Sequence, residues 1–355
     1  MQATRTTTRT IASAGALWLA ASTAAMAQAP TFTLKFSHAA PATEIADDHV
    51  AALYLKSYLE SRSGGRIKVE IYPASQLGDF RAMVEQVQLG TLEMAHTSVG
   101  GIGQFFPEIQ VLELPYIIPD DLTAERLSRS AYMAEMRDAV LKKTGNVRMG
   151  SATNTGRFRS FFTTKKQILS AADLKGVKMR TVDSPVEMEF VRFLGGNPTP
   201  IVWGELFTSL KTNVVEGTKN AATDIIPSNM HDALKFVVLD EHSYLWGFNW
   251  ISDKWLKSLP ADLQDMVGDG LAQMADVQFQ YNKSYEGKSL DIFAKSGGKI
   301  HVPTPEQKKT FEAGKDHMKA WFGAKYGKDW VEKLDRAVAE QQVALAKDRN
   351  GWLGR

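Results

Sequence analysis

The feature of this 355-residue sequence that most limits its fold is a regular alternation of strand-like and helix-like segments. Apolar and polar residues alternate over 32–37 and 67–71, and apolar residues recur at helical spacing over 50–59 between them. The same rhythm returns in the middle of the chain, over 147–239. Strands that alternate with helices are typical of an α/β domain with a largely parallel sheet. The sequence therefore predicts two α/β regions.

The last third of the chain is helical by the same criterion. Seven apolar residues from Leu263 to Tyr281 fall on one stripe, and the pattern can continue to Phe293, although Gly268 and Gly270 lower its helix propensity. A stripe of this length predicts a helix that crosses between lobes.

The length of the chain also favours two lobes, because single hydrophobic cores stop growing near ~250–300 residues. No flexible linker separates the two regions, so the lobes are expected to be joined by several chain crossings. We predict lobe I from residues 28–155 and 242–285, and lobe II from residues 156–241 and 286–355, which include C-terminal helices.

The first 27 residues differ in character from the rest. Arg5 and Arg9 precede an apolar run over 11–26, and Ala25-Met26-Ala27 places small residues where a signal peptidase cleaves. The alternative is a membrane anchor, but the run is shorter than the ~20 apolar residues that a spanning helix needs. We expect residues 1–27 to be a cleaved secretory signal peptide and the mature chain to be exported.

Composition excludes several classes of function. Removal of residues 1–27 removes two of the 42 basic residues and none of the 40 acidic ones, so the mature chain has no formal net charge. It also has no basic stripe, so no nucleic-acid partner is expected. Because the sequence contains no cysteine, it can form no disulfide, zinc–thiolate site or thiol nucleophile.

Enzyme motifs are absent, and no cofactor or metal is expected. The sequence has no G-x-S-x-G elbow, phosphate-binding P-loop or H-E-x-x-H helix. His38 and His49 could meet in space, but nothing demands a metal. The adjacent carboxylates Asp47-Asp48 and Asp240-Glu241 point in different directions in regular structure, so we expect them to be solvated or capping residues.

Two arginines are the most informative residues. Arg180 lies near the end of the predicted strand 177–182, just before a helix whose start is marked by Ser184, and ligands of α/β folds bind outside the carboxyl ends of strands. Arg159, in the preceding strand-like segment, could converge with it. A guanidinium offers a permanently charged planar fork to a carboxylate. The alternative is an ordinary surface salt bridge.

Further candidates follow the arginines. Trp203 could form an apolar wall and Asn220 could donate to a carboxylate or hydroxyl; alternatively Trp203 belongs to the core and Asn220 caps a turn. The other candidate ligand-binding residues are Asn154, Glu205, Phe207 and Lys219.

At these residues the sequence resembles the solute-binding proteins of tripartite ATP-independent periplasmic (TRAP) transporters, the DctP-like family. The resemblance covers most of residues 31–260. The matching stretches are FSHAAP, GGRIKVEIYPASQLG, VQLGTLEMA, FFTTKKQILSAADLKGVKMRTVDSPV and LGGNPTPIVWGELFTSLKTNVVEGTKN.

The resemblance implies a type II periplasmic-binding-protein-like fold, in which two lobes close on a ligand and one long helix spans both. It implies a periplasmic protein that captures a small organic acid and delivers it to the membrane subunits of a TRAP transporter. Arg180 would pair with the ligand carboxylate, supported by Arg159 and Asn220. The alternatives are an exported, hydrolase-like enzyme acting on an organic acid, or a ligand-sensing subunit of a membrane receptor.

One departure from the family pattern concerns Lys219, because the residue before the family asparagine is commonly acidic or amide-bearing. If Lys219 faces the cleft, it favours a second anionic group on the ligand. The residues do not distinguish a dicarboxylate, a sugar acid, a 2-oxo acid and an aromatic acid.

Overall fold

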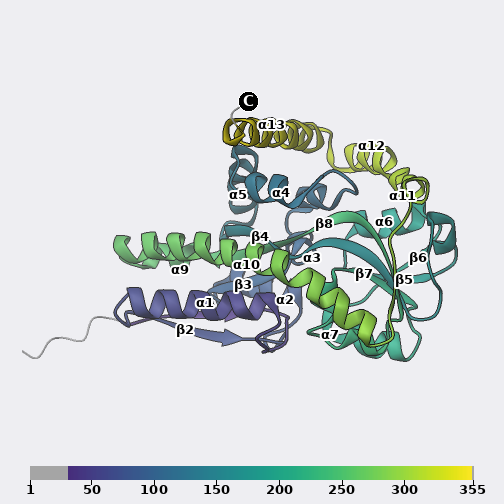
Figure 1. Ribbon diagram of the computed structural model, residues 1–355. Coiled ribbons are helices and arrows are strands. Elements are labelled where there is room, and N and C mark those ends of the chain that lie inside the picture. The colour runs from purple at the N-terminus through teal and green to yellow at the C-terminus, as the bar shows by residue number, and fades with distance from the viewer. Residues whose placement is uncertain (1–30, 354–355) are drawn as a thin grey trace, which may run out of the picture. The chain divides into compact units, whose positions relative to one another are not determined.

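The computed structural model describes residues 31–353 as one compact unit (Figure 1). The predicted signal peptide, residues 1–27, lies outside the described residues. Within residues 31–353, no helix is long and apolar enough to cross a membrane. The strands, in chain order, are β1 (Phe32–Ser37), β2 (Ile67–Tyr72), β3 (Met94–Ser98), β4 (Val147–Thr163), β5 (Lys178–Thr181), β6 (Asn197–Pro200), β7 (Gly217–Asn220), β8 (Phe236–Ser252) and β9 (Lys299–His301).

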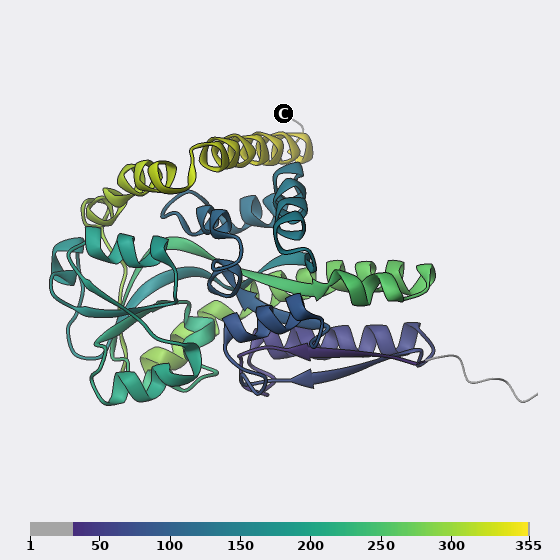
Figure 2. The same cartoon turned by 180° about the vertical axis from the view of Figure 1, so that it is seen from behind.

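Helices cover both faces of the sheet (Figures 1 and 2). The α-helices are α1 (Asp47–Arg62), α2 (Phe80–Leu89), α3 (Val99–Ile102), α4 (Asp121–Leu127), α5 (Ala131–Thr144), α6 (Pro185–Phe193), α7 (Trp203–Lys211), α8 (Ala222–Ile225), α9 (Asp253–Ser258), α10 (Ala261–Lys295), α11 (Pro305–Glu312), α12 (Gly314–Tyr326) and α13 (Asp329–Trp352). Three short 3₁₀ helices are η1 (Pro107–Glu113), η2 (Ala171–Leu174) and η3 (Met230–Asp232).

The nine strands form one mixed sheet in the order β2-β1-β3-β8-β4-β7-β5-β6, with β9 beside β8. It contains two parallel groups, β2-β1-β3 and β7-β5-β6, as the alternation of strands and helices predicts. The prediction of a largely parallel sheet is nevertheless incomplete. Two antiparallel strands of 17 residues each, β4 and β8, join the groups.

Residues 147–163 form one strand, β4, which pairs with β8 on both sides of three register shifts. One of these shifts lies between Asn154 and Arg157 and contains Gly156 at φ 124°. A Cβ on Gly156 would lie 2.6 Å from Ala221 Cβ and 2.8 Å from Thr223 Oγ1, so only glycine fits. The strand bends where the two parallel groups meet.

Helix α10 confirms the predicted long helix and runs along the molecule (Figure 1). It packs against α1 and β4, and also against α8 and β9, so it contacts both parallel groups. Gly270 lies within the helix without interrupting it. A Cβ there would lie 3.0 Å from Tyr58, so the glycine lets α10 approach α1 closely.

The core consists of three buried clusters. One lies between β1, β2, α1 and the first half of α10; a second lies beneath α7 and α8. The largest joins both parallel groups through β4 and β8. Residues 244–252 of β8 are all buried, as in a strand that is covered on both faces.

The C-terminal helix α13 lies over α4 and α5 (Figures 1 and 2). The Trp330 ring meets Tyr132 edge-on at 5.7 Å, and Arg126 donates to Asp348 at 2.8 Å. Thus α13, assigned to lobe II by sequence, contacts helices assigned to lobe I. The predicted lobe boundaries stay a prediction.

Candidate ligand-binding site

A cavity opens where the carboxyl ends of four parallel strands converge, β1 and β3 from one parallel group and β5 and β7 from the other. This is where α/β folds place ligands. The cavity is small, about 50 Å³, against the ~300–1,000 Å³ of typical small-molecule sites. Its lining includes Ala39, Ala40, Pro41, Ala46, Asp47, Asp48, Phe80, Ser98, Thr155, Arg159, Arg180, Val182, Trp203, Asn220, Thr223, Asp224, Pro227, Ser228 and Leu245.

Arg180, near the end of β5, lines this cavity although it is only 2% exposed. Its Nε donates to the carbonyl of Ile201 at 2.9 Å, and its guanidinium carbon lies 5.6 Å from the centre of a Trp203 ring. Its two terminal nitrogens have no hydrogen-bond partner within residues 31–353. Burial lowers the pKa of Arg180 to about 10, so the side chain stays charged at neutral pH. A buried, incompletely paired cation is costly unless an anion joins it.

Arg159 also lines the cavity, but it is already paired. Its Nη1 donates to the carbonyl of Lys219 at 3.0 Å, and its Nη2 lies 3.1 Å from Oε1 of Glu187 on α6. Both members of this ion pair are buried. Arg159 therefore adds positive charge beside Arg180 but keeps fewer free donors for a ligand.

Lys219 points away from the cavity. Its Nζ lies 3.3 Å from Oε2 of Glu187, and it is not among the lining residues. Glu187 lies in the first turn of α6, where its backbone N–H donates to the Ser184 side chain. Its carboxylate bridges Arg159 and Lys219. Burial alone would raise the pKa of Glu187, but these two cations lower it to about 2.

Glu113 lies beside Glu187 and behaves differently. Burial and the neighbouring charge of Glu187 raise the pKa of Glu113 to about 8, so its carboxyl is protonated at neutral pH. It accepts a hydrogen bond of 2.6 Å from the Ser184 hydroxyl. One carboxyl of this pair is ionised and the other is neutral.

Asn220 and Trp203, two of the candidates from the sequence, line the cavity with the arginines. Asn220 Oδ1 accepts from Thr218 at 2.8 Å, and its Nδ2 donates to Asp224 at 3.1 Å. Trp203 begins α7 and stacks near Arg180.

Three further candidates lie outside the lining. Asn154 is fully buried, where it donates to the Tyr244 hydroxyl at 2.7 Å and accepts from Asn282 at 2.6 Å. Glu205 is exposed, and Phe207 packs against the core beneath α7. The structure therefore brings Arg180, Arg159, Asn220 and Trp203 together, and it places Lys219, Asn154, Glu205 and Phe207 elsewhere.

The sequence prediction for Asp47 and Asp48 was wrong. Both side chains are buried and line the cavity, rather than being solvated. Asp240 is also buried, bonded to His242 at 2.9 Å. The loop after β1 reaches the same crevice as Arg180, so the strand-end rule applied to Arg180 identifies these aspartates as well.

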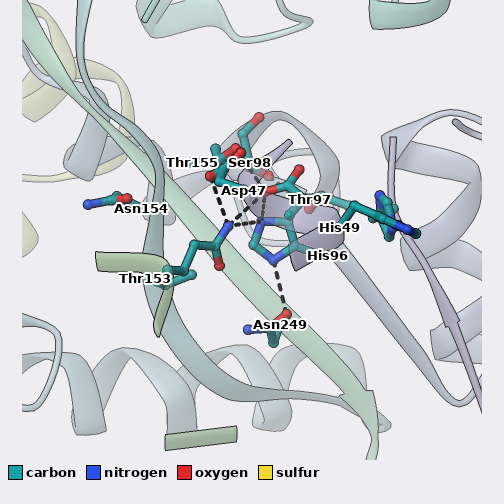
Figure 3. A network of polar contacts seen from close by, with 12 residues as sticks. Asp47, His49, His96, Thr97, Ser98, Thr153, Asn154, Thr155 and Asn249 are labelled. Carbon is teal, nitrogen blue, oxygen red and sulfur yellow. Dashed lines mark hydrogen bonds and ion pairs between the residues drawn. The ribbon is translucent and has the colours of Figure 1, made fainter. Parts of the chain in front are cut away.

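Figure 3 shows the polar network around Asp47. His96 Nε2 lies 3.0 Å from Asp48 Oδ1, and His96 Nδ1 lies 3.0 Å from Asn249 Oδ1 (Figure 3). Because both ring nitrogens face oxygens, the ring fits its protonated form. Burial alone would lower the pKa of His96, but Asp48 raises it above its usual value. Burial and the charge of Asp48 raise the pKa of Asp47 to about 7.

The predicted meeting of His38 and His49 is confirmed, with 3.2 Å between Nε2 and Nδ1. Burial lowers the pKa of His38 to about 4, so its ring is neutral. Within the described part of the chain, no group of three or more histidine, aspartate or glutamate residues is arranged to hold a metal ion.

A second hollow adjoins the cavity and shares Phe80, Arg180, Val182 and Trp203 with it. It continues outward along residues 75–81 and 200–204. Arg180 is therefore reachable from both hollows.

The sheet, the spanning helix and the strand-end cavity define the class of the molecule: a two-lobed solute-binding protein of the type II fold. Two solved structures share this fold. The sugar acid binding protein DctPAm from Advenella mimigardefordensis, in complex with galactonate, has a TM-score of 0.84 at 21% identity and covers 88% of this chain and 99% of its own. A TRAP periplasmic solute-binding protein from Desulfovibrio salexigens with bound orotic acid has a TM-score of 0.82 at 22% identity and covers 88% of this chain and 100% of its own.

A family model described as bacterial extracellular solute-binding protein, family 7 (DctP), matches residues 36–322, and the chain belongs to this family. The sialic acid-binding periplasmic protein SiaP of Vibrio cholerae is 28% identical over 316 residues, which is 89% of this chain and 96% of that protein. The C4-dicarboxylate-binding periplasmic protein DctP of Rhodobacter capsulatus is 26% identical over 330 residues, which is 92% of this chain and 96% of that protein.

Proposed function

We propose that this protein captures a small organic acid in the periplasm and delivers it unchanged to the membrane subunits of a TRAP transporter. The observation that carries the proposal is Arg180, a buried guanidinium whose two terminal nitrogens are unpaired within residues 31–353 and which lines the cavity. A carboxylate is its natural partner, because the planar fork matches the two carboxylate oxygens.

The relatives support the same chemistry. Those named above bind sialic acid and C4-dicarboxylates, and the two similar structures hold galactonate and orotic acid. All of these ligands carry a carboxylate. In our proposal Arg180 holds the carboxylate, Arg159 adds positive charge, and Asn220 and Trp203 shape the site.

Binding is proposed to act through closure of the lobes. The cavity is lined from the strand ends of both parallel groups, so a ligand bound there contacts both. A ligand that interacts better with the closed form shifts the population toward it. The membrane subunits would then recognise the closed, loaded form.

The main test is calorimetric titration of the purified protein with organic acids found by thermal shift. Replacement Arg180→Ala is expected to weaken binding by on the order of 2–5 kcal/mol, because the ligand carboxylate is left without its charged partner. The control Arg192→Ala removes an arginine that is largely exposed and paired with Glu189. Equal affinity in the two variants would rule out the role of Arg180.

Two further measurements test transport and location. Mass spectrometry of the protein from a periplasmic extract should give a mature N-terminus after Ala27. Ligand recovered after long incubation should be chemically unchanged, whereas a product in the mixture would favour the enzyme alternative.

A further inference from the structure

Three carboxyl groups line the same cavity as the arginines. Asp47 and Asp48 begin α1, after β1, whereas Asp224 lies in α8, after β7. We call these three residues the acidic group. Arg180 ends β5, in the parallel group that does not contain β1. The cavity therefore offers a ligand both a cationic and an acidic surface.

Each member of the acidic group uses one carboxyl oxygen within the protein. Asp48 Oδ1 accepts from Thr155 at 3.0 Å and from Gln278 at 2.7 Å. Asp47 Oδ2 accepts from Asn282 at 2.8 Å, and Asp224 Oδ2 accepts from Asn220 at 3.1 Å. No donor within residues 31–353 is hydrogen-bonded to the second oxygen of any of the three. Three carboxyl oxygens of the cavity lining thus remain for a ligand.

Ser98 is a second, independent sign that polar groups of the cavity lining remain available to a ligand. This residue ends β3, lines the cavity and is 4% exposed, yet its hydroxyl has no hydrogen-bond partner in the described part of the chain. A buried polar group without a partner costs free energy. A polar ligand group next to Ser98 would supply the missing bond.

The charge of the acidic group decides which ligand groups fit it. His96 and Thr155 help to lower the pKa of Asp48 although burial opposes them, so Asp48 is ionised. Burial, reinforced by the neighbouring aspartates, raises the pKa of Asp224. A ligand carboxylate placed here would face the like charge of Asp48. Hydroxyl and ammonium groups would donate to the unused oxygens instead.

We infer that the ligand carries a single carboxylate, bound at Arg180, together with hydroxyl or ammonium donors that face Asp47, Asp48 and Asp224. The inference rests on the proposed function and narrows it, because it disfavours a dicarboxylate that spans the cavity. The orientation of Lys219 agrees, since this cation faces Glu187 and not a second anionic group of the ligand.

Matched probes test the inference by changing one end of the ligand at a time. Succinate, 4-hydroxybutyrate and 4-aminobutyrate share a four-carbon chain, while galactonate and galactarate differ only in a terminal hydroxymethyl or carboxylate. Calorimetry should show that at least one donor-bearing monocarboxylate binds more tightly than its matched dicarboxylate, by about tenfold or more, because like charges at a buried contact are strongly unfavourable. The hydroxy and amino probes also distinguish the two kinds of donor.

Two variants assign the effect to these residues. Ser98→Ala removes a hydroxyl that makes no bond within the described protein, so it should fold normally and bind the preferred probe several-fold more weakly. Asp48→Asn should reduce the preference for that probe over its matched dicarboxylate. The control Glu205→Gln makes the same carboxylate-to-amide change at an exposed residue outside the cavity.

The outcomes separate the two proposals. A dicarboxylate that binds as tightly as its matched monocarboxylate, or more tightly, overturns the inference and leaves the proposed function intact. If none of the five probes nor any other carboxylate binds, the proposed function fails, and this inference fails with it.

Discussion

Two pairs of buried carboxyl side chains lie at or near the cavity, and the two pairs have different roles. Glu113 and Glu187 lie behind the arginines, and Asp47 and Asp48 line the cavity itself. In each pair one carboxyl is ionised and its neighbour holds a proton or titrates near neutral pH, because two buried like charges are unfavourable.

The cations around the two pairs differ. Glu187 is bridged by Arg159 and Lys219, whereas Asp48 is paired with His96, a residue type whose ordinary pKa lies near neutral pH. The glutamate pair therefore serves as a fixed support for Arg159. The aspartate pair faces the ligand and can adjust its protonation to it.

The largest expected effect is that of Glu187→Gln. This change leaves Arg159 and Lys219 buried without their counter-charge, and breaking such a pair costs about 3–5 kcal/mol of unfolding free energy. Urea unfolding at pH 7 measures the loss, with Glu205→Gln as the exposed control. If the loss of unfolding free energy is similar to that of the control, Glu187 does not stabilise Arg159 and Lys219.

A smaller effect is expected for Asp48→Asn. His96 loses its partner, but a histidine can release its proton, so the cost should be about 1–3 kcal/mol. The same unfolding measurement checks the value, and an NMR titration should show a lowered pKa for His96. If Asp48→Asn costs as much as Glu187→Gln, the distinction between the two pairs is lost.

The pH dependence of stability sharpens the comparison. The folded-state pKa values of Asp47, about 7, and Glu113, about 8, lie above the ordinary values of 3.8 and 4.5. Their contribution to stability is complete below those ordinary values and is lost as pH rises through 7 and 8. For Glu187, whose pKa is lowered to about 2, the contribution is present above 4.5 and is lost as pH falls toward 2. The unfolding free energy of the wild-type protein, relative to that of the double variant Asp47→Asn, Glu113→Gln, should therefore fall over pH 5, 6, 7 and 8. The comparison with the variant cancels the opposite contribution of His38, whose lowered pKa adds stability as pH rises. A constant difference over this interval would contradict the assignment of the two protonated carboxyls.

The smallest effect is expected for Glu113→Gln alone. Its carboxyl is already neutral at pH 7, and a glutamine oxygen can accept the same bond from Ser184. The change should cost less than about 1 kcal/mol of unfolding free energy at pH 7. A cost close to that of Glu187→Gln would mean that Glu113 is ionised instead.

Local sequence patterns predicted the elements and one side of the cavity. Periodicity located the strands and the long helix, and the rule that ligands meet strand ends brought in Arg180. The parallel groups were expected, but their connection was not, because a strand interrupted by bulges resembles two short strands. No local sequence pattern shows that the pairing of β4 with β8 resumes after residues 154–157.

The other side of the cavity depends on contacts between distant residues. Asp47 and Asp48 look solvated because they are adjacent and begin a helix, yet Gln278 and Asn282 of α10 cover them. The helix start at Ser184 was correctly predicted, but no local pattern shows where the Glu187 side chain lies. The buried cations on β4 and β7 bind it.

The continuity of β4, β8 and α10 has a mechanical consequence. These three crossings between the parallel groups are regular structure rather than loose linkers. Any change in the angle between the lobes must bend the β4–β8 ribbon and helix α10 together. The molecule thus resists large or random swings, and the elastic restoring force would act again each time the cavity empties.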